Sequence, residues 1–497
     1  MSNVRLSYSG MISFVIMVIS AFTGLAFTLI VTRQLSPEEF GLWTLIGSLV
    51  VYVIIFEPIS SFWVTRQVAR NEKASVTGIG TNSFFSGIAL AIYMVIIFFF
   101  VNQTDVDYNI LLLAGILIPI YYINRSLVSI VAGYKPQGTG YGTLVFEFIK
   151  IPSGLMLVYY GEMGIIGAIL ATAMGQTAQL VFYAYYVREK FKEKFSMLHF
   201  KNWIKLAWLP LVAGGHDKIR VLDVAIFTMI TGSLTGLAFW GVGLALSNIV
   251  GYSKSISAGL YPKLLFSQKG EYIEIVLKRT LFFAIPLVGM AFIFAKPGLW
   301  VLNPLYIEGV VVVYVWIVLQ FIYIFEELFD AVLNGIEKVD VGFGAKFKEY
   351  VKSRLITVPL IYTIGRSVYL GIISIIFVIS LQTNMIEIET LIWWGIVGII
   401  IDISIVTIFW KMIVKTLPFK WPIVGITKFV FATLIAGSVT YYFLENFLVY
   451  EKTIFIFLPS TIPYFLTYVT IYFSIMSIID NDTRLFIKSI FQEIRQK

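Results

Sequence analysis

The 497-residue sequence contains no cysteine, only 2 histidines and few charged residues. Without cysteine there are no disulfides, thiol nucleophiles or cysteine-ligated metals. Two histidines without an H-E-x-x-H pattern argue against a zinc enzyme. The phosphate-loop pattern G-x-x-x-x-G-K-[ST] is also missing, which argues against ATP hydrolysis. The glycines of G-T-G-Y-G at 138–142 follow no predicted strand and are a weak match to a nucleotide fingerprint. We therefore expect no metal, no cofactor and no enzyme.

Charged residues make up 13% of the chain and hydrophobic residues 58%, with a mean hydropathy of +0.86. A soluble domain carries about 25% charged residues, so the composition predicts an all-α polytopic membrane protein. The apolar run from Gly10 to Val31 is too long for the core of a cleaved signal peptide and predicts a retained first span. The net charge of +8 comes mainly from short loops beside apolar spans. Membrane topology and anionic headgroups explain such loops better than nucleic acid does.

About 20 predominantly apolar residues are needed for each transmembrane helix. The hydrophobic pattern predicts fourteen spans, near 10–31, 40–63, 78–101, 108–131, 143–160, 164–187, 206–231, 235–261, 280–302, 306–333, 353–380, 390–410, 422–444 and 453–479.

The loop charges predict the orientation of these spans. With the amino terminus inside, nearly all lysines and arginines fall in inward loops and the tail, whereas the outward loops hold only Arg33, Lys296 and Lys452. Because basic residues favour the cytoplasmic side, both termini are expected there. The longest inward loop, 188–205, alternates aromatic residues with lysines. It predicts either a helix lying on the inner membrane surface or a plain solvated linker.

Two stretches of the sequence recur about two hundred residues later. GYGTLVFEFIK at 140–150 returns as GFGAKFKEYVK at 342–352, with Gly140/Gly342, Gly142/Gly344, Glu147/Glu349 and Lys150/Lys352 identical. At an offset of 200, FTLI at 27–30 returns as FTMI at 227–230, Phe40-Gly41 as Trp240-Gly241, and Tyr52 as Tyr252. Two regions with nearly the same offset predict a duplicated six-span unit. Glu147 and Lys150, at helical spacing, are expected to bridge locally.

An even number of spans per copy inserts both copies in the same orientation, so the lobes are related by an axis along the membrane normal. The predicted domains are a six-helix lobe at 1–195, a second at 196–418, and two further helices with a cytoplasmic tail at 419–497.

Several motifs carry a resemblance to a known family. They are L-S-P-E-E-F-G-L-W after the first span, Asp223 followed by G-L-A-F-W-G-V-G-L-A, Pro262, and L-N-G-I-E-K-V-D at 333–340. In order and spacing they resemble the polysaccharide-transporter family, the Wzx-type oligosaccharide flippases of the multidrug/oligosaccharidyl-lipid/polysaccharide exporter superfamily. The resemblance covers essentially the whole chain. It implies two six-helix lobes around a central cavity, two additional carboxy-terminal helices, and alternating access for a lipid-linked oligosaccharide.

Ionisable side chains at membrane depth are costly and mark functional positions. The seventh predicted span holds the densest set: His216, Asp217, Lys218, Arg220 and Asp223. The preceding Gly214-Gly215 is expected to break the helix, as in many transport sites. His216, Arg220 and Asp223 follow the i, i+4, i+7 spacing of one helical face.

Lys218 and Arg220 are suited to the diphosphate that joins sugar to polyprenol in the substrate implied by the resemblance. Asp223 would restrain or release Arg220 as occupancy changes. The alternative is an internally neutralised Asp–Arg cluster that only holds this span to its neighbours. Either His216 or Asp223 is a candidate for coupling transport to protons or sodium, with Asp217 beside them.

Other charged side chains lie at matching depths in the two predicted lobes. Glu57 and Lys254 are candidates for an inner gate across the lobes, and Arg125 maps onto Glu327 at an offset of 202. Each of these residues has the alternative of pairing within its own lobe. Arg33, at the outer end of the first span, is a candidate phosphate contact or a marker of the headgroup boundary.

The leading hypothesis is a flippase, expected as a monomer in the cell membrane, that moves a polyprenyl-diphosphate oligosaccharide between leaflets for surface polysaccharide or glycoprotein assembly. A cation-coupled multidrug antiporter is the alternative, although intramembrane cations suit an anionic substrate better. A membrane glycan polymerase or ligase is a third reading, but such enzymes need a sizeable outer domain, and no outward loop is long enough.

Overall fold

The computed structural model describes residues 23–101, 106–135, 138–266, 268–337, 339, 347–481 and 483–484. These residues are helical apart from turns and short connections, and 12 of their helices are long and apolar enough to cross a membrane. The predicted all-α polytopic membrane fold is therefore confirmed. The first predicted span lies partly outside the described residues, which are helical from 23 to 34. The predicted seventh span is present as α10 (Trp208–Thr231), whose charged side chains lower its mean hydropathy.

The chain divides into two compact units, one formed by Met1–Gly241 with Tyr350–Val397 and the other by Val242–Glu349 with Gly398–Lys497. The remaining elements of unit 1 are α2 (Pro37–Val53), η1 (Ile54–Phe56), α3 (Pro58–Ala69), α4 (Ser75–Val101), α5 (Tyr108–Ala114), α6 (Leu117–Tyr134), α7 (Gly138–Gly154), η2 (Leu155–Tyr160), α8 (Gly164–Tyr186), η3 (Arg188–Lys192), α9 (Met197–Lys205) and α17 (Arg354–Thr383). Unit 2 holds η4 (Tyr252–Gly259), α12 (Leu260–Phe266), α13 (Gly270–Ile293), α14 (Ala295–Leu302), η5 (Pro304–Gly309), α15 (Val310–Gly335), α19 (Ile423–Phe447) and α20 (Ile454–Ile479). Three helices continue from one unit into the other: α11 (Leu234–Gly251), α16 (Phe347–Lys352) and α18 (Glu387–Thr416). The lobe boundaries expected from the sequence, at 195 and 418, stay a prediction.

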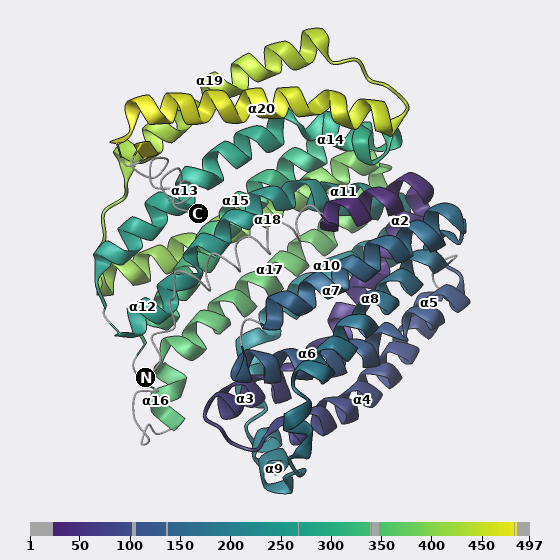
Figure 1. Ribbon diagram of the computed structural model, residues 1–497, viewed down its shortest axis with the longest axis vertical. Helices are drawn as coiled ribbons and strands as arrows, with labels where there is room; N and C mark the ends of the chain where they lie inside the picture. Colours follow the sequence, from purple (N-terminus) through teal and green to yellow (C-terminus); the bar gives the residue numbers. More distant parts are fainter. Residues whose placement is uncertain are drawn as a thin grey trace. The chain divides into compact units, whose positions relative to one another are not determined.

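Unit 1 is built around α6, which packs against α3, α4 and α8, while α7 lies along α8 and α10 along α17 (Figure 1). A buried cluster that includes Val64, Leu127, Ile130 and Tyr183 forms part of its core. Outward-facing positions are apolar too: Phe98 and Phe99 of α4 are exposed, as expected for helices that contact lipid.

The L-S-P-E-E motif has a local physical role at the start of α2. The Ser36 hydroxyl accepts a hydrogen bond from the backbone N–H of Glu39 at 3.2 Å, and Glu39 Oε2 accepts one from the backbone N–H of Ser36 at 2.9 Å. This capping box satisfies two amides that would otherwise lack partners, and Pro37 suits the first helical turn. The motif therefore sets where α2 begins.

The glycines of G-T-G-Y-G serve helix packing. A Cβ at Gly142 would come within 2.1 Å of the Tyr183 ring, and one at Gly138 within 2.4 Å of Tyr186. Glycines four residues apart thus let the tyrosines of α8 approach the backbone of α7, the geometry typical of small residues in membrane helices. The local bridge expected within α7 is also present, with Lys150 Nζ 3.0 Å from Glu147 Oε2.

Unit 2 contains the two carboxy-terminal helices, α19 and α20, which lie side by side and pack on α13 (Figure 1). Two tyrosines of α20 tie it to α13: Tyr468 Oη donates to the carbonyl of Pro286 at 2.7 Å, and Tyr472 Oη to that of Phe282 at 2.8 Å. Both hydrogen bonds are buried, so the pairing of α20 with α13 has a defined register.

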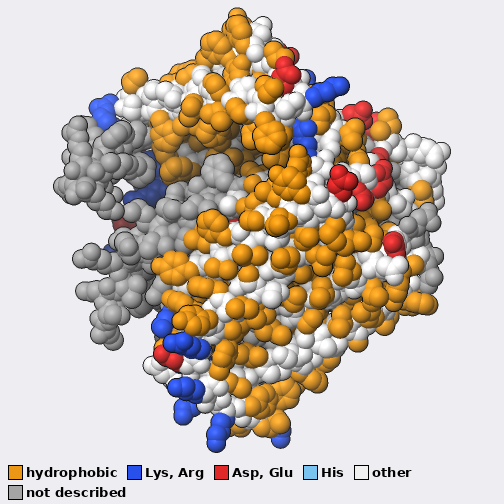
Figure 2. All heavy atoms as spheres, turned by 45° about the vertical axis from the view of Figure 1, so that its right-hand side comes forward, with side chains coloured by type: hydrophobic (Ala, Val, Ile, Leu, Met, Phe, Trp, Pro, Cys, Tyr) orange, Lys and Arg blue, Asp and Glu red, His pale blue; other side chains and the backbone are white. Residues whose placement is uncertain are grey.

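The segment 188–205 contains η3 and α9, with α9 packed on α3 and α4. Glu193 Oε2 accepts a hydrogen bond from the backbone N–H of Ser75 at 2.8 Å, and the backbone N–H of Ser196 donates to Thr77 Oγ1 at 2.8 Å. Trp203 is buried in the unit 1 core. In Figure 2, Lys and Arg side chains gather at the lower end, the end of unit 1 that carries α9 in Figure 1. The segment is a docked helical element rather than a plain linker.

Candidate functional site

The charged helix α10 runs from Trp208 to Thr231 without interruption. The expected break at Gly214-Gly215 is therefore wrong. A Cβ at either glycine would meet nothing within 4 Å, so neither is needed for close packing. Lys218 and Arg220 are half-buried. The side chains of His216 and Asp217 lie outside the described part of the structure.

Asp223 is buried in an aromatic environment contributed by α17 and α18. Tyr369 Oη donates to Asp223 Oδ2 at 2.7 Å and Trp394 Nε1 at 3.3 Å, while Asp223 Oδ1 accepts the backbone N–H of Val224 at 2.8 Å. The charge of Asp223 also interacts with that of Arg220. A buried carboxylate with this many donors is well satisfied. The arrangement favours the interpretation that Asp223 fastens α10 to its neighbours.

Glu57 lies where the predicted second span is interrupted, between η1 and the Pro58 that begins α3. Its charge interacts with those of Arg125 on α6 and Lys218 on α10. Three elements of unit 1 therefore bring a carboxylate and two cations within electrostatic range. The sequence did not predict this grouping.

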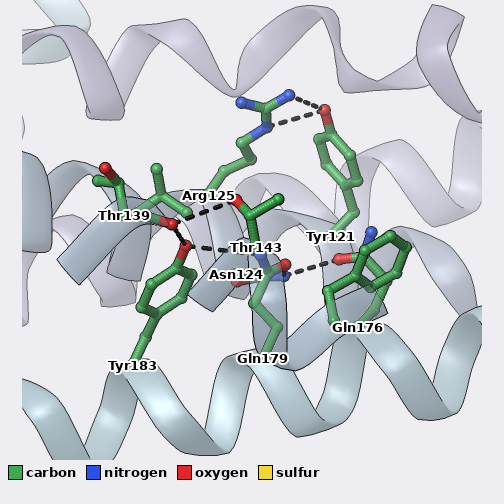
Figure 3. A pocket seen from close by; sticks show the side chains of 10 residues that line it. Tyr121, Asn124, Arg125, Thr139, Thr143, Gln176, Gln179 and Tyr183 are labelled. Carbon is green, nitrogen blue, oxygen red and sulfur yellow. Dashed lines mark hydrogen bonds between the residues drawn. The ribbon is translucent and has the colours of Figure 1, made fainter. Parts of the chain in front are cut away.

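Beside Arg125 a cavity of about 280 Å³ opens among α6, α7 and α8. Arg125 is exposed and its guanidinium donates to the Tyr121 hydroxyl, through Nε at 2.8 Å and also through Nη2. Deeper in the cavity, Asn124 Nδ2 donates to Gln176 Oε1 and Gln179 Oε1, each at 2.7 Å. Figure 3 shows these amides converging between the helices. With Tyr183 of α8, six polar side chains thus line the two walls formed by α6 and α8.

The third wall, α7, adds hydroxyls and an aromatic face. Tyr183 Oη, from α8, donates to the carbonyl of Thr139 at 2.9 Å, and Thr143 Oγ1 donates to the same carbonyl at 3.2 Å. Phe146 and Val128 supply the apolar part of the lining. The described residues of this lining include no carboxylate. The cavity combines amides, hydroxyls, one guanidinium and an aromatic ring, a set that both donates and accepts hydrogen bonds.

In unit 2, Lys254 Nζ lies 2.7 Å from Glu327 Oε1. This pair joins η4 to α15 within one unit, which is the alternative that the sequence left open for both residues. A neighbouring amide pair, Gln320 Nε2 to Asn248 Oδ1 at 2.9 Å, ties α15 to α11. A gate between Glu57 and Lys254 stays a prediction.

Arg33 is half-buried near the end of the first described helix, 23–34. Its role as a phosphate contact or a boundary marker stays a prediction. The residues that sequence reasoning missed are the neutral ones of the cavity, above all Asn124, Gln176 and Gln179. The sequence does contain a signal for these residues, since each is a carboxamide within an otherwise apolar span. Like a charge, a carboxamide in the membrane needs a hydrogen-bond partner, and it therefore indicates a polar contact.

No family model and no curated protein matches the sequence. Solved structures match this chain in fold, and one of them is described as a member of the MOP superfamily, the multidrug/oligosaccharidyl-lipid/polysaccharide exporters. An inward-facing multidrug resistance MATE family transporter of that superfamily aligns over 80% of this chain and 95% of its own, at 13% identity and a TM-score of 0.57. A MATE structure in complex with MaL6 aligns over 83% and 96%, at 15% identity and a TM-score of 0.54.

The lipid II flippase MurJ, in an inward closed conformation, aligns over 95% of this chain and 99% of its own. The identity is 16% and the TM-score 0.61. At these identities the likeness shows the fold, which is the polytopic membrane fold shared by this flippase and the MATE transporters.

Proposed function

We propose that the protein is a flippase that carries a polyprenyl-diphosphate-linked oligosaccharide across the cell membrane by alternating access, for surface polysaccharide or glycoprotein assembly, with both termini cytoplasmic. The observation that carries the proposal is the extent of the match to the lipid II flippase, 95% of this chain and 99% of that one.

The carboxy-terminal helices distinguish this match from the others. The uncovered 5% of 497 residues is about 25 residues, fewer than the 51 that α19 (25 residues) and α20 (26 residues) contain together. At least part of this pair therefore has a counterpart in the flippase. The MATE alignments leave 17–20% of the chain uncovered, about 84–99 residues and enough to hold both helices. A helix pair shared with a lipid flippase supports a role in guiding the lipid tail.

The chemistry of unit 1 supports an anionic, sugar-bearing substrate. Lys218, Arg220 and Arg125 offer cations at membrane depth, where guanidinium and ammonium groups favour phosphate oxygens. In the described part of the chain, the lining of the cavity beside Arg125 holds no carboxylate. The carboxylate of Asp223 already accepts hydrogen bonds from Tyr369 and Trp394. The other carboxylate described in this region, that of Glu57, already interacts with Arg125 and Lys218.

The test is transport by the purified protein in liposomes. A polyprenyl-diphosphate oligosaccharide with a labelled sugar is placed in one leaflet, and its appearance in the other is followed with an impermeant sugar-modifying reagent. The measurement is repeated with imposed proton and sodium gradients, which identify or exclude ion coupling through Asp223, His216 or another group. Protein-dependent movement supports the proposal. Absence of movement, together with drug exchange driven by a cation gradient, would replace it with the antiporter.

A further inference from the structure

The cavity among α6, α7 and α8 contains a buried polar atom without a partner. Asn124 is only 4% exposed, and its Nδ2 is shared by the two glutamine carbonyls, but its Oδ1 has no hydrogen-bond partner among the described residues. A buried acceptor left unpaired costs free energy. Asn124 lines the cavity, and its Oδ1 has almost no accessible surface in this arrangement, so a ligand donor reaches this acceptor when the amide turns toward the cavity.

The lining restricts the chemical class of that ligand. Among the described residues that line the cavity there is no carboxylate, and Arg125 is the one cation. This lining disfavours a cation and offers a phosphate a single charged partner. Amides and hydroxyls both donate and accept, as sugar hydroxyls do. Tyr121 and Phe146 add apolar ring surface of the kind that covers the C–H face of a sugar.

The size restricts it further. Small-molecule sites have volumes of about 300–1,000 Å³, and this cavity, at about 280 Å³, lies at the lower limit. It suits one ring rather than a whole oligosaccharide. The exposed Arg125 next to the buried Asn124 gives the cavity a charged outer end and a neutral inner end.

We propose that this cavity is a pyranose subsite, in which Asn124 Oδ1 accepts a hydrogen bond from a sugar hydroxyl while Gln176 and Gln179 contact neighbouring hydroxyls. The inference rests on the proposed function, in which the ligand is a polyprenyl-diphosphate-linked oligosaccharide. The ring in this cavity would be the sugar next to the diphosphate. Arg125, at the outer end, then faces the diphosphate.

Binding of free sugars tests the subsite without transport. Glucose, galactose, mannose and N-acetylglucosamine are titrated onto the purified full-length protein in detergent, with saturation-transfer NMR as the readout and glycerol as a control polyol. At least one sugar is expected to bind saturably, with a dissociation constant on the order of 1 mM. Asn124→Ala is expected to weaken it about tenfold, because the central amide is lost.

Two further variants control for folding. Gln176→Met keeps the side-chain size and removes the amide, so it weakens sugar binding even where Asn124→Ala fails to fold. Asn82→Ala is the matched control: Asn82 is a buried amide of α4 that donates to the carbonyl of Tyr122 on α6 at 3.3 Å, outside the cavity lining. Unchanged binding in Asn82→Ala supports the subsite. Saturable binding of none of the four sugars, or equal binding by all variants, overturns it.

The two proposals fail separately. Sugar binding by a protein that moves no lipid-linked oligosaccharide in liposomes leaves the subsite standing and removes the flippase. Transport by a protein that binds none of the sugars removes the subsite and leaves the flippase.

Discussion

Helices α6 and α15 occupy matching positions in the two units if the sequence offset of 202 reflects a duplication. At that offset Arg125 corresponds to Glu327. In unit 1 the Arg125 guanidinium is held by a neutral phenol, that of Tyr121, beside an open cavity. In unit 2 the Glu327 carboxylate is paired with Lys254 at 2.7 Å. The charge of Glu57 acts on Arg125 and Lys218 together, whereas Lys254 lies directly against Glu327. Under the proposed function, Arg125 in unit 1 contacts the ligand, and Glu327 in unit 2 forms an internal ion pair.

The largest effect on transport is expected when the cations of α10 are removed. Lys218→Ala combined with Arg220→Ala is expected to lower flux in proteoliposomes about a thousandfold, because two charge-assisted contacts with the diphosphate are lost. Removing two exposed charges from the 188–205 segment, Lys192→Ala with Lys194→Ala, is the matched control and should leave flux unchanged. Normal flux in the α10 double variant would remove the diphosphate site from unit 1.

The next largest effect is expected on the stability of the protein when the ion pair inside α7 is broken. Glu147 and Lys150 side chains are only about a tenth exposed, so Lys150→Met leaves a buried carboxylate unpaired and should cost about 3–5 kcal/mol of unfolding free energy. The double variant with Glu147→Gln should recover most of that loss, since both charges are gone. Denaturant unfolding in micelles measures both, and equal stability of the two variants would contradict the reasoning.

Arg125 and Glu327 test the comparison directly. Arg125→Gln is expected to lower flux about tenfold through a lost phosphate contact, while Arg125→Lys retains most of it. Glu327→Gln, in unit 2, is expected to change flux less than about threefold. Should the two glutamine variants lose flux equally, the assignment of different roles to the two units is wrong.

The stability contribution of the Lys254–Glu327 pair is expected to be small. The Glu327 side chain is 57% exposed, and ion pairs in contact with water contribute about 0–1 kcal/mol. A double-mutant cycle with Lys254→Met and Glu327→Gln, read out by unfolding in micelles, should give a coupling energy below about 1 kcal/mol. A coupling as large as that of Glu147 with Lys150 would show that exposure does not separate the two pairs.

A weaker, pH-dependent effect is expected at Asp480, which follows α20 in unit 2. Burial by itself raises the pKa of Asp480, but hydrogen bonds from Thr483 and from Lys428 Nζ, at 3.2 Å, outweigh it and hold the pKa below its ordinary value. A carboxylate whose pKa is lower in the folded state contributes stability above its unfolded value near 3.8 and loses it as pH falls through the folded value. Melting temperatures below about pH 4 should therefore fall less steeply in Asp480→Asn. An identical pH dependence would contradict this account.

Local features of the structure were predictable because they depend on near neighbours in the chain. The spacing of Glu147 and Lys150 predicted their contact, since residues three apart share a helical face. The Gly214-Gly215 break was wrong for a related reason: glycine lowers helix propensity, but membrane burial favours a continuous hydrogen-bonded helix.

The partners of the candidate site were much less predictable. The charges of Lys218, Arg220 and Asp223 predicted that these residues matter. The sequence did not indicate that Tyr369 and Trp394 would donate hydrogen bonds to the Asp223 carboxylate. Nor did it single out Asn124, whose partners Gln176 and Gln179 are 52 and 55 residues away. A neutral amide contributes little to charge or to hydrophobic periodicity, so neither pattern in the sequence marks Asn124.

By itself, the sequence determined that this protein is a polytopic α-helical membrane protein. The favourable free energy of transferring apolar side chains into lipid adds up along each span and does not depend on the neighbouring helices. It also determined local details such as the capping box of α2. The tertiary structure decided which polar side chains meet, and so where a cavity opens among α6, α7 and α8. Those contacts depend on how each helix is rotated and crossed against the next, and that is set by close packing, as where Gly138 and Gly142 admit the tyrosines of α8.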